Sequence, residues 1–465
     1  MNWRQVTCGL GVTLLLQACA TYYQSNQTFN QQFETGDLEK ALATLREQSH
    51  EARGKREFLY FVNKGLVLSL LGRYEESNEF LERAYLFGED YRKNYLNEAA
   101  SYLTNPMITQ YRGEDHEHLF VLYYKALNFA KMGKTDQALV ECRRLNIRAQ
   151  QLADRYSSER KFQRDAFVHT LMGILYETDR DYNNAFIAYR QAVEIYEQDY
   201  EALFQQSMPD QLKLDVLRTA TLSGFDDEVQ FFKEKFNLPD YSYVPPAHGE
   251  LIFFWHNGLA PIKAEWGVTF MITRRDNMAY ISNAELGLTF PFSLDGFSEE
   301  DRRGLSSLEF FRVAFPRYVE RPTFFNRAKL KHGDREHQLQ LLENVNKIAL
   351  KGLEQRMGLE FSKALIRVAV KKAAEYQVRK EDKMLGSILN AINTATERAD
   401  TRNWQTLPHS IYFTRIPLNE GQNHVSLALA GMQGEVVHNF VYEGRPGQIL
   451  FHTFSSLESR FPAYY

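Results

Sequence analysis

Two groups of residues in the 465-residue sequence have the types that bind metal ions. The run Asp115-His116-Glu117-His118 is the first, and His424, His438 and His452 form the second. Imidazole and carboxylate groups ligate transition metals, but residues two positions apart on a helix do not share a face. We therefore expect the first group to be a solvated loop or helix start. The three histidines fall on predicted strands and could cluster, so metal binding is the minor interpretation there.

Cys142 is a further residue that could be catalytic, as a nucleophile. It falls inside a predicted helix at a packing position. A buried cysteine usually acts as a small hydrophobic residue. The sequence has no Gly-x-Ser-x-Gly elbow, phosphate-binding loop, dinucleotide fingerprint or His-Glu-x-x-His run, the motifs of several common enzyme classes. We predict a non-enzymatic protein with no metal and no cofactor. A hydrolase built from scattered Asp, Glu and His residues is an alternative that no spacing supports.

Four residues of the C-terminal half are candidate binding or structural positions: Arg402, Trp404, Asn257 and Lys263. Arg402 and Trp404 are two residues apart, so on a strand they would share one face, where a guanidinium can stack on an indole. The pair could bind a planar ligand or peptide. The favoured interpretation is structural, with Trp404 anchoring the chain and Arg402 shielding it. Asn257 is expected in a turn, with Lys263 available to a carboxylate.

The first twenty residues have the pattern of an export signal. Arg4 is followed by a short apolar run from Cys8 to Leu16, too short to span a membrane and of the length of a signal-peptide core. The run ends in Leu16-Gln17-Ala18-Cys19, which resembles the lipobox of bacterial lipoproteins. The resemblance implies cleavage before Cys19, diacylglycerol (and palmitate-type acylation) on that residue and membrane anchoring. An ordinary secretory signal is the alternative.

The net charge and the residue after Cys19 limit the classes of partner and the membrane that we expect for this protein. The formal net charge is −4, whereas nucleic-acid-binding domains are usually basic, so we predict no nucleic-acid partner. Two or more acyl chains attach a protein stably to a bilayer. Ala20 follows Cys19 without the aspartate that would suggest inner-membrane retention. By resemblance to Gram-negative lipoproteins, we expect an outer-membrane anchor facing the periplasm.

A turn motif recurs along the N-terminal half. Its copies begin at Gly36, Gly72, Gly133, Arg180 and, weakly, Gly224. They resemble the inter-helix turn of tetratricopeptide (TPR) repeats, which also place small and large residues at fixed offsets around the turn. The spacings of 36, 61, 47 and 44 residues are irregular, so we expect interruptions around 90–118 and 150–165. Plain helical hairpins are the alternative. TPR arrays hold partners on a concave surface.

The period of the apolar residues changes after Pro245-Pro246, which favours a linker. Alternating runs rich in β-branched and aromatic residues then predict strands. These runs are 251–255, 266–272, 311–315, 410–416, 424–429, 436–442 and 448–454. Residues 443–447 have the composition of a hairpin turn between the last two.

The segment at about 335–400 is expected to be a helical insertion, because Leu342, Val345, Ile348 and Leu353 recur at helical spacing. Its second half is basic around Lys371 and Lys372. We expect solvated faces of packed helices there, and a surface for anionic lipid is the alternative.

The predicted fold class is α+β, an N-terminal TPR-like array of helical hairpins followed by a mixed domain with an antiparallel β-sheet. The predicted order along the chain is a signal peptide 1–18, a lipidated tether 19–32, a repeat domain 33–238, a linker 239–248, and a C-terminal α+β domain 249–465 with its helical insertion.

The whole chain resembles a family of bacterial, mainly proteobacterial, TPR-type lipoproteins. Its most specific matches are the run from Asn257 to Lys263 (Asn-Gly-Leu-Ala-Pro-Ile-Lys) and the run from Asp400 to Pro408 (Asp-Thr-Arg-Asn-Trp-Gln-Thr-Leu-Pro). The resemblance covers nearly the full length. It implies an envelope location and no particular reaction.

Two functions remain open from the sequence. The first is a lipid-anchored periplasmic scaffold of the outer membrane that binds envelope proteins through its repeats. The alternative is a glycan- or peptidoglycan-binding lipoprotein whose β-rich domain would stack sugar rings on Trp255, Trp266 and Trp404.

Overall fold

A computed structural model describes most of the chain. The described residues are 21–93, 109–154, 162–275, 277–285, 287–293, 295, 310–357, 398–432 and 434–457. The predicted signal peptide 1–18, the lipid-bearing Cys19 and most of the predicted helical insertion, with its basic stretch, lie outside these ranges. Within them, no helix combines the length and the apolar character that membrane crossing requires.

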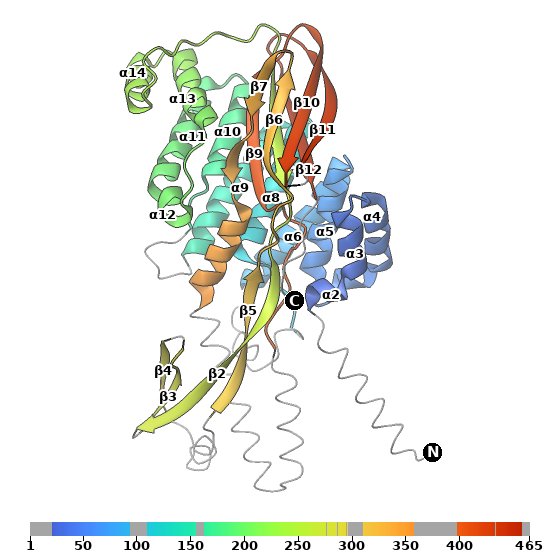
Figure 1. The fold of residues 1–465 in the computed structure, drawn as a ribbon, viewed down its shortest axis with the longest axis vertical. Helices are drawn as coiled ribbons and strands as arrows, with labels where there is room; N and C mark the ends of the chain where they lie inside the picture. Colours follow the sequence, from blue (N-terminus) through green and yellow to red (C-terminus); the bar gives the residue numbers. More distant parts are fainter. Residues whose placement is uncertain are drawn as a thin grey trace.

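The N-terminal half consists of antiparallel helical hairpins, and the predicted array is confirmed. The pairs are α3 (Gln27–Glu34) with α4 (Leu38–Glu47), α5 (Glu57–Leu70) with α6 (Tyr74–Lys93), α8 (Asp115–Lys131) with α9 (Thr135–Ala153), α10 (Ala166–Thr178) with α11 (Tyr182–Ile195), and α13 (Asp210–Ser223) with α14 (Asp226–Lys235). Shorter elements are α2 (Tyr22–Ser25), η1 (Ser49–Arg53), the π-helical η4 (Tyr196–Tyr200) and α12 (Glu201–Phe204). Figure 1 shows the hairpins following one another in an arc, from α4 on one side to α14 on the other.

The turns of these hairpins depend on left-handed backbone conformations. Each predicted turn begins with a positive φ, including 61° at Arg180 where no glycine is present. Close helix packing depends on two other glycines. A Cβ added at Gly65 would lie 2.7 Å from Leu81, and one at Gly173 would lie 2.4 Å from Tyr189. Small residues at these positions therefore let the two helices of a hairpin approach each other.

Residues 21–32 belong to the segment predicted to be a tether between the lipid and the first helix, but they are helical. They form α2 and most of α3, and Thr21 and Gln24 make a capping box at the start of α2. Tyr22, Phe29 and Phe33 are buried in the core. Their spacing follows the helical period, so one apolar stripe packs on the protein although the intervening residues are polar.

The C-terminal half contains three four-stranded sheets. The inner sheet has the order β12 (Ile449–Ser456), β1 (Glu250–Asn257), β9 (Ser410–Pro417), β8 (Gln340–Glu343). The outer sheet has the order β11 (Gly434–Gly444), β10 (Gly421–Gly431), β6 (Phe325–His332), β7 (Arg335–Gln338). The lower sheet, at the bottom of Figure 1, has the order β4 (Leu288–Ser293), β3 (Met278–Asn283), β2 (Ile262–Arg275), β5 (Phe310–Val319). Each of the seven predicted runs lies in one of these strands, except that Gln448 precedes β12.

The inner sheet lies between the helices and the outer sheet. Along β1, Ile252 and Phe254 belong to the core shared with the helices. Leu251 and Phe253 belong to a second core shared with the outer sheet. Alternate residues of a strand point to opposite faces, so the continuous apolar run of β1 is explained by burial on both faces. The helical and β-rich regions therefore share one hydrophobic core, and residues 239–248 connect α14 to β1 without helix or strand.

One prediction about the β-rich region is wrong, and the start of the predicted helical insertion is misplaced. Residues 443–447 do not close a hairpin, because β11 pairs with β10 whereas β12 pairs in parallel with β1. The segment from residue 335 begins with β7 and β8, and its described helix covers 345–357. Residues 335–343 form strands because β6 and β9 supply hydrogen-bonding partners that local sequence does not reveal.

Candidate functional site

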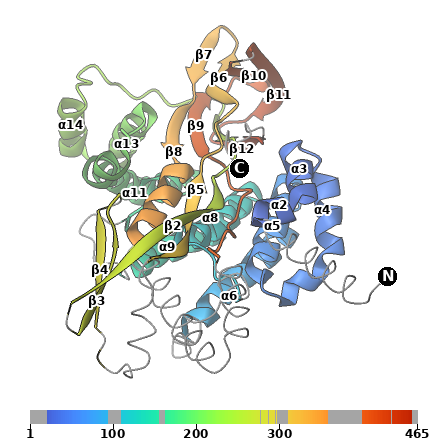
Figure 2. The same ribbon diagram turned by 60° about the horizontal axis from the view of Figure 1, so that its bottom comes forward.

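The inner side of the helical array is covered by the chain's own inner sheet and by residues 398–409. Figures 1 and 2 show the strands lying between the two ends of the helical arc. Three side-chain clusters join the first helices of the hairpins to the β-rich region, and one pocket lies between these layers. The surface that was expected to hold a partner is thus filled from within the same molecule.

The first cluster surrounds Arg415 of β9. Its guanidinium contacts Glu177 of α10 at 2.5 Å and Glu250 of β1 at 2.9 Å. Glu177 also accepts from Arg218 of α13 at 2.8 and 2.9 Å, and Arg218 reaches Asp215 at 2.7 Å. Burial alone would raise the pKa of Glu177, but Arg218 and Arg415 outweigh it and lower that pKa to about 2. The cluster therefore fixes α10 and α13 to the inner sheet with charged groups excluded from water.

The second cluster begins at Glu114, the residue that caps α8. Its carboxylate contacts Lys263 of β2 at 2.5 Å and also Arg356. Burial opposes ionisation of Glu114, yet Arg356 and Lys263 lower its pKa to about 2. Lys263 is 3% exposed, so its charge is neutralised inside the protein.

The run Asp115-His116-Glu117-His118 was expected to be a solvated loop or helix start. It is the start of a helix, but it is not solvated. His116, Glu117 and His118 are buried, and burial lowers the pKa of His116 to about 4. α8 is enclosed on nearly all sides. The run therefore has no separate polar and apolar faces, and its polar residues do not reveal from the sequence that they are buried. Within the ranges described, no group of three or more His, Cys, Asp or Glu residues is placed to hold a metal ion.

The third cluster holds the irregular segment 398–409. Arg402 and Trp404 are buried there and do not lie on a strand. The Arg402 guanidinium bonds to Asp400, donates to the Thr109 carbonyl at 2.8 Å and lies over the ring of Tyr111. The Trp404 backbone N–H donates to Glu117 at 2.5 Å. Arg402 through its side chain and Trp404 through its backbone attach the segment to the helical region, and neither side chain is open to a ligand.

Asn257 lies at the end of β1 and is also buried. Its side-chain amide donates to the Phe325 carbonyl at 3.0 Å and its oxygen accepts from Ser456 at 3.3 Å. It therefore ties β1 to the first residue of β6 and the last residue of β12.

The aromatic platform required for the glycan-binding alternative is not formed. Trp255 and Trp404 are fully buried, and the Trp255 indole N–H donates to Ser456 at 2.9 Å. Trp266 is half-buried on β2. A sugar ring stacks on an exposed aromatic face, so these three residues cannot act together as such a site.

Among the other predicted chemistry-bearing residues, His452, His438 and Cys142 have packing roles, whereas His424 is exposed on β10. His452 stacks on Phe253 with ring centroids 4.9 Å apart, and His438 contacts Phe454 at 4.5 Å. Cys142 is buried in α9, and burial raises the pKa of its thiol. A thiol is a weak nucleophile when burial suppresses the thiolate.

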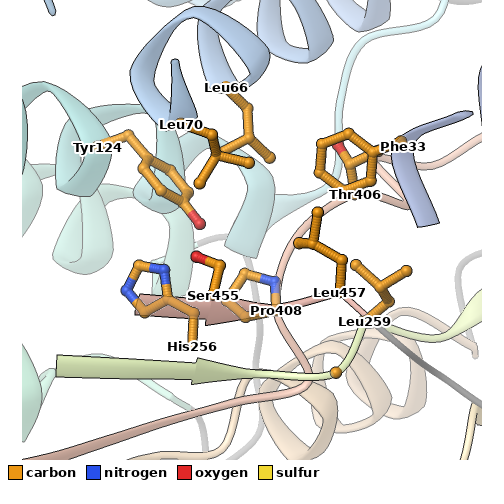
Figure 3. Close-up of a pocket in the computed structure, with 11 residues that line it drawn as sticks. Phe33, Leu66, Leu70, Tyr124, His256, Leu259, Thr406, Pro408, Ser455 and Leu457 are labelled. Carbon is orange, nitrogen blue, oxygen red and sulfur yellow. The ribbon is translucent and has the colours of Figure 1, made fainter. Parts of the chain in front are cut away.

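A small pocket, with room for about one water molecule, lies between the helices and the inner sheet. Figure 3 shows Leu66, Leu70 and Tyr124 on the helical side, with His256 and Ser455 on the strand side. Burial lowers the pKa of His256 to about 3, so its ring is neutral. No charged side chain lines the pocket, and a charged ligand would lose its hydration there without compensation.

A buried pair of carboxyl groups joins α10 to β8. The Tyr200 hydroxyl lies 2.7 Å from Glu343 and 3.3 Å from Asp165. Burial raises the pKa of Asp165 to about 6 and raises that of Glu343 well above its ordinary value. No cation neutralises this pair among the contacts described, so the folded protein favours its protonated forms. Asp165 and Glu343 could not be recognised from the sequence, because their partners are distant in the chain.

Comparison with known proteins identifies a repeat. Residues 168–199, which cover most of α10, all of α11 and part of η4, match the tetratricopeptide repeat. No curated protein matches the sequence. Among solved structures, BtubC (BKLC) from P. vanneervenii is 17% identical with a TM-score of 0.31, covering 46% of this chain and 79% of its own. A tetratricopeptide repeat protein from Parabacteroides merdae is 14% identical with a TM-score of 0.29, covering 46% and 66%. MamA AMB-1 is 14% identical with a TM-score of 0.29, covering 46% and 96%.

Proposed function

We propose that this chain is a non-enzymatic scaffold of the bacterial envelope, built on the tetratricopeptide repeat that residues 168–199 match. Lipid on Cys19 would anchor it to the outer membrane, facing the periplasm, where it would bind other envelope proteins. Two features support the proposal. TPR arrays recognise proteins across extended surfaces, and Leu16-Gln17-Ala18-Cys19 resembles a lipobox.

The observation that carries the proposal is the helical array with its tetratricopeptide match at residues 168–199, and the inner side of this array is already occupied. Arg415, Trp404 and His256 of the β-rich region each bond to a first helix of a hairpin. The repeats therefore act here as a rigid support, and a partner has to approach the second helices, which lie on the other side. Ile147 of α9 is 56% exposed there, seven residues from the exposed Val140, so both lie on one helical face.

The partner surface is tested with a photo-crosslinking amino acid at Ile147 in growing cells. We expect one envelope protein to be linked at this position and identified by mass spectrometry. Val244, 80% exposed in the connection between α14 and β1, is the matched control and should not link that protein. With the crosslinker moved to the neighbouring exposed Val140, Ile147→Lys should abolish capture while leaving the circular dichroism spectrum unchanged, because substitution of an exposed residue changes stability little. The same adducts at both positions, or none at Ile147, would contradict a docking role for α9.

The anchor is tested separately with Cys19→Ser. We expect this variant to lose all incorporation of labelled palmitate and to retain residues 1–18, because thioether formation at Cys19 precedes signal cleavage in lipoproteins. The mature, acylated parent should sediment with outer membranes, since several acyl chains make attachment stable. Cys142→Ser, at a buried position, is the control and should keep the label. Labelling of the Cys19→Ser variant would disprove the anchor without affecting the partner surface.

A further inference from the structure

β11 differs from the other sheet edges of the described chain. β7 is short and carries Arg335 and Glu336. β4 contains Pro291 and β5 contains Pro316. Short length, charge and proline are the usual ways of preventing an edge strand from pairing with another molecule. β11 is the least protected edge: it runs for 11 residues, has no Pro, Lys or Arg, carries charge only at Glu435 and Glu443 near its ends, and pairs with β10 on one side only.

The two remaining edges belong to the inner sheet and are covered. In β8, the Leu342 carbonyl accepts from Tyr196 and Gln206 at 2.6 and 3.2 Å. β12 is half-buried along its length and packs beside α8. β11 is thus the long edge whose outward backbone groups find no protein partner among the described residues.

The position of β11 is fixed by its inward side chains. Phe440 packs on His452 with ring centroids 4.7 Å apart, and His438 packs on Phe454. The opposite face presents Val437 and Val441, which are 50% and 57% exposed. Between them Asn439 accepts a hydrogen bond from Ser426 at 2.7 Å. A rigid strand with free backbone groups is a template for strand addition, in which a second strand supplies the missing hydrogen bonds.

We propose that β11 pairs antiparallel with β11 of a second copy of this chain, about a twofold axis at Asn439, so that the two outer sheets become one continuous sheet. The side-chain pattern selects both the occupant and the register. A twofold axis normal to the sheet keeps the outward faces of both copies on one side. With the axis at Asn439, Val437 lies opposite Val441 of the partner copy at two symmetric positions. Moving the axis by one residue places each valine opposite a polar residue, Asn439, Glu435 or Glu443.

The ends of the paired strands supply an electrostatic signature. In this register Glu435 lies opposite Glu443 of the other copy, and like charges directly opposite each other disfavour pairing. Arg445 already contacts Glu443 at 2.9 Å, which reduces the repulsion. Replacing Glu435 with arginine should therefore convert a repulsive contact into an attractive one at both ends.

The test measures the oligomeric state of the purified full-length protein by sedimentation velocity over a concentration series, in one detergent for all variants. We expect a reversible dimer. Val437→Lys should weaken it by about 100-fold, because lysine on an edge strand opposes pairing. Glu435→Arg should tighten it by about tenfold. Met271→Lys, at a position 42% exposed on the lower sheet, is the control and should leave the dimer unchanged. Circular dichroism confirms that each variant is folded.

The register is tested by Asn439→Cys. A residue on the axis faces its own copy, so oxidation should give a disulfide-linked dimer that the parent, with the same other cysteines, does not form. A parent that stays monomeric at every concentration would overturn the proposal. A dimer that resists Val437→Lys, or an absence of linkage through Asn439→Cys, would show that any association uses another surface.

Discussion

Arg415→Met should destabilise the folded protein by about 3–5 kcal/mol, the usual cost of removing one partner from a buried ion-pair network. The substitution leaves Glu177, Asp215 and Glu250 facing the guanidinium of Arg218 alone. Methionine fills a similar volume, so the loss reflects charge rather than a cavity. Equilibrium unfolding in urea, followed by circular dichroism, measures the change in the free energy of unfolding.

Arg445→Met is the matched control, because Arg445 pairs with Glu443 at the surface, where both side chains are 63% exposed. Exposed ion pairs contribute less than about 1 kcal/mol, so this variant should unfold almost as the parent does. The double variant Arg415→Met with Glu177→Gln removes one charge of each sign. It should be less destabilised than the sum of the two single variants, since residues in one network do not act additively. An Arg415→Met protein as stable as Arg445→Met would show that the cluster does not hold the helices to the sheet.

Acid should weaken the same cluster. The pKa of Glu177 in the folded protein is lowered to about 2, whereas an unfolded glutamate titrates near 4.3. The unfolded chain therefore binds the proton more tightly. The stabilisation is complete above the unfolded pKa and is lost as the pH falls from about 4 towards 2.

The helical hairpins could be predicted from the sequence because their signals are local. A glycine or Arg180 at each turn, and Gly65 and Gly173 facing a large residue one helix away, occupy only a few tens of residues. The seven predicted strand runs were found in the same way, through their β-branched and aromatic composition. These local signals do not show which other helix or strand each element packs against.

The connections between the layers could not be predicted for that reason. Arg415 and Glu177 are separated by 238 residues, and either could have been a solvated surface charge. β12 pairs with β1 about two hundred residues away in sequence, so a nearby hairpin turn was the better local guess. Tyr22 and Phe33 had helical spacing, but the surrounding polar residues concealed it. One signal was available: the unbroken apolar run Leu251–Trp255 is typical of a strand buried on both faces.

Glu343→Gln should stabilise the protein at neutral and alkaline pH by about 1–3 kcal/mol, the range for relieving a buried polar group of its desolvation cost. In the folded protein the pKa of Asp165 is raised to about 6 and that of Glu343 is raised further by burial. The folded state therefore binds protons more tightly than the unfolded chain. Stability from these groups is complete below about pH 4 and falls as the pH rises, by up to about 1.4 kcal/mol per pH unit for each carboxyl that ionises only in the unfolded state.

Glutamine reproduces the neutral acid at this position. Its oxygen can accept from the backbone N–H of Asn344, and its amide can donate to the Tyr200 hydroxyl, replacing the contacts that Glu343 makes. At pH 4 the variant and the parent should unfold at the same urea concentration, and the difference should appear only as the pH rises. Glu336→Gln is the control, because Lys329 and Lys331 lower the pKa of this exposed carboxyl, and it should give no alkaline gain. If Glu343→Gln shifted stability equally at all pH values, the buried pair between α10 and β8 would be ionised in the folded protein and a cation outside the described residues would have to neutralise it.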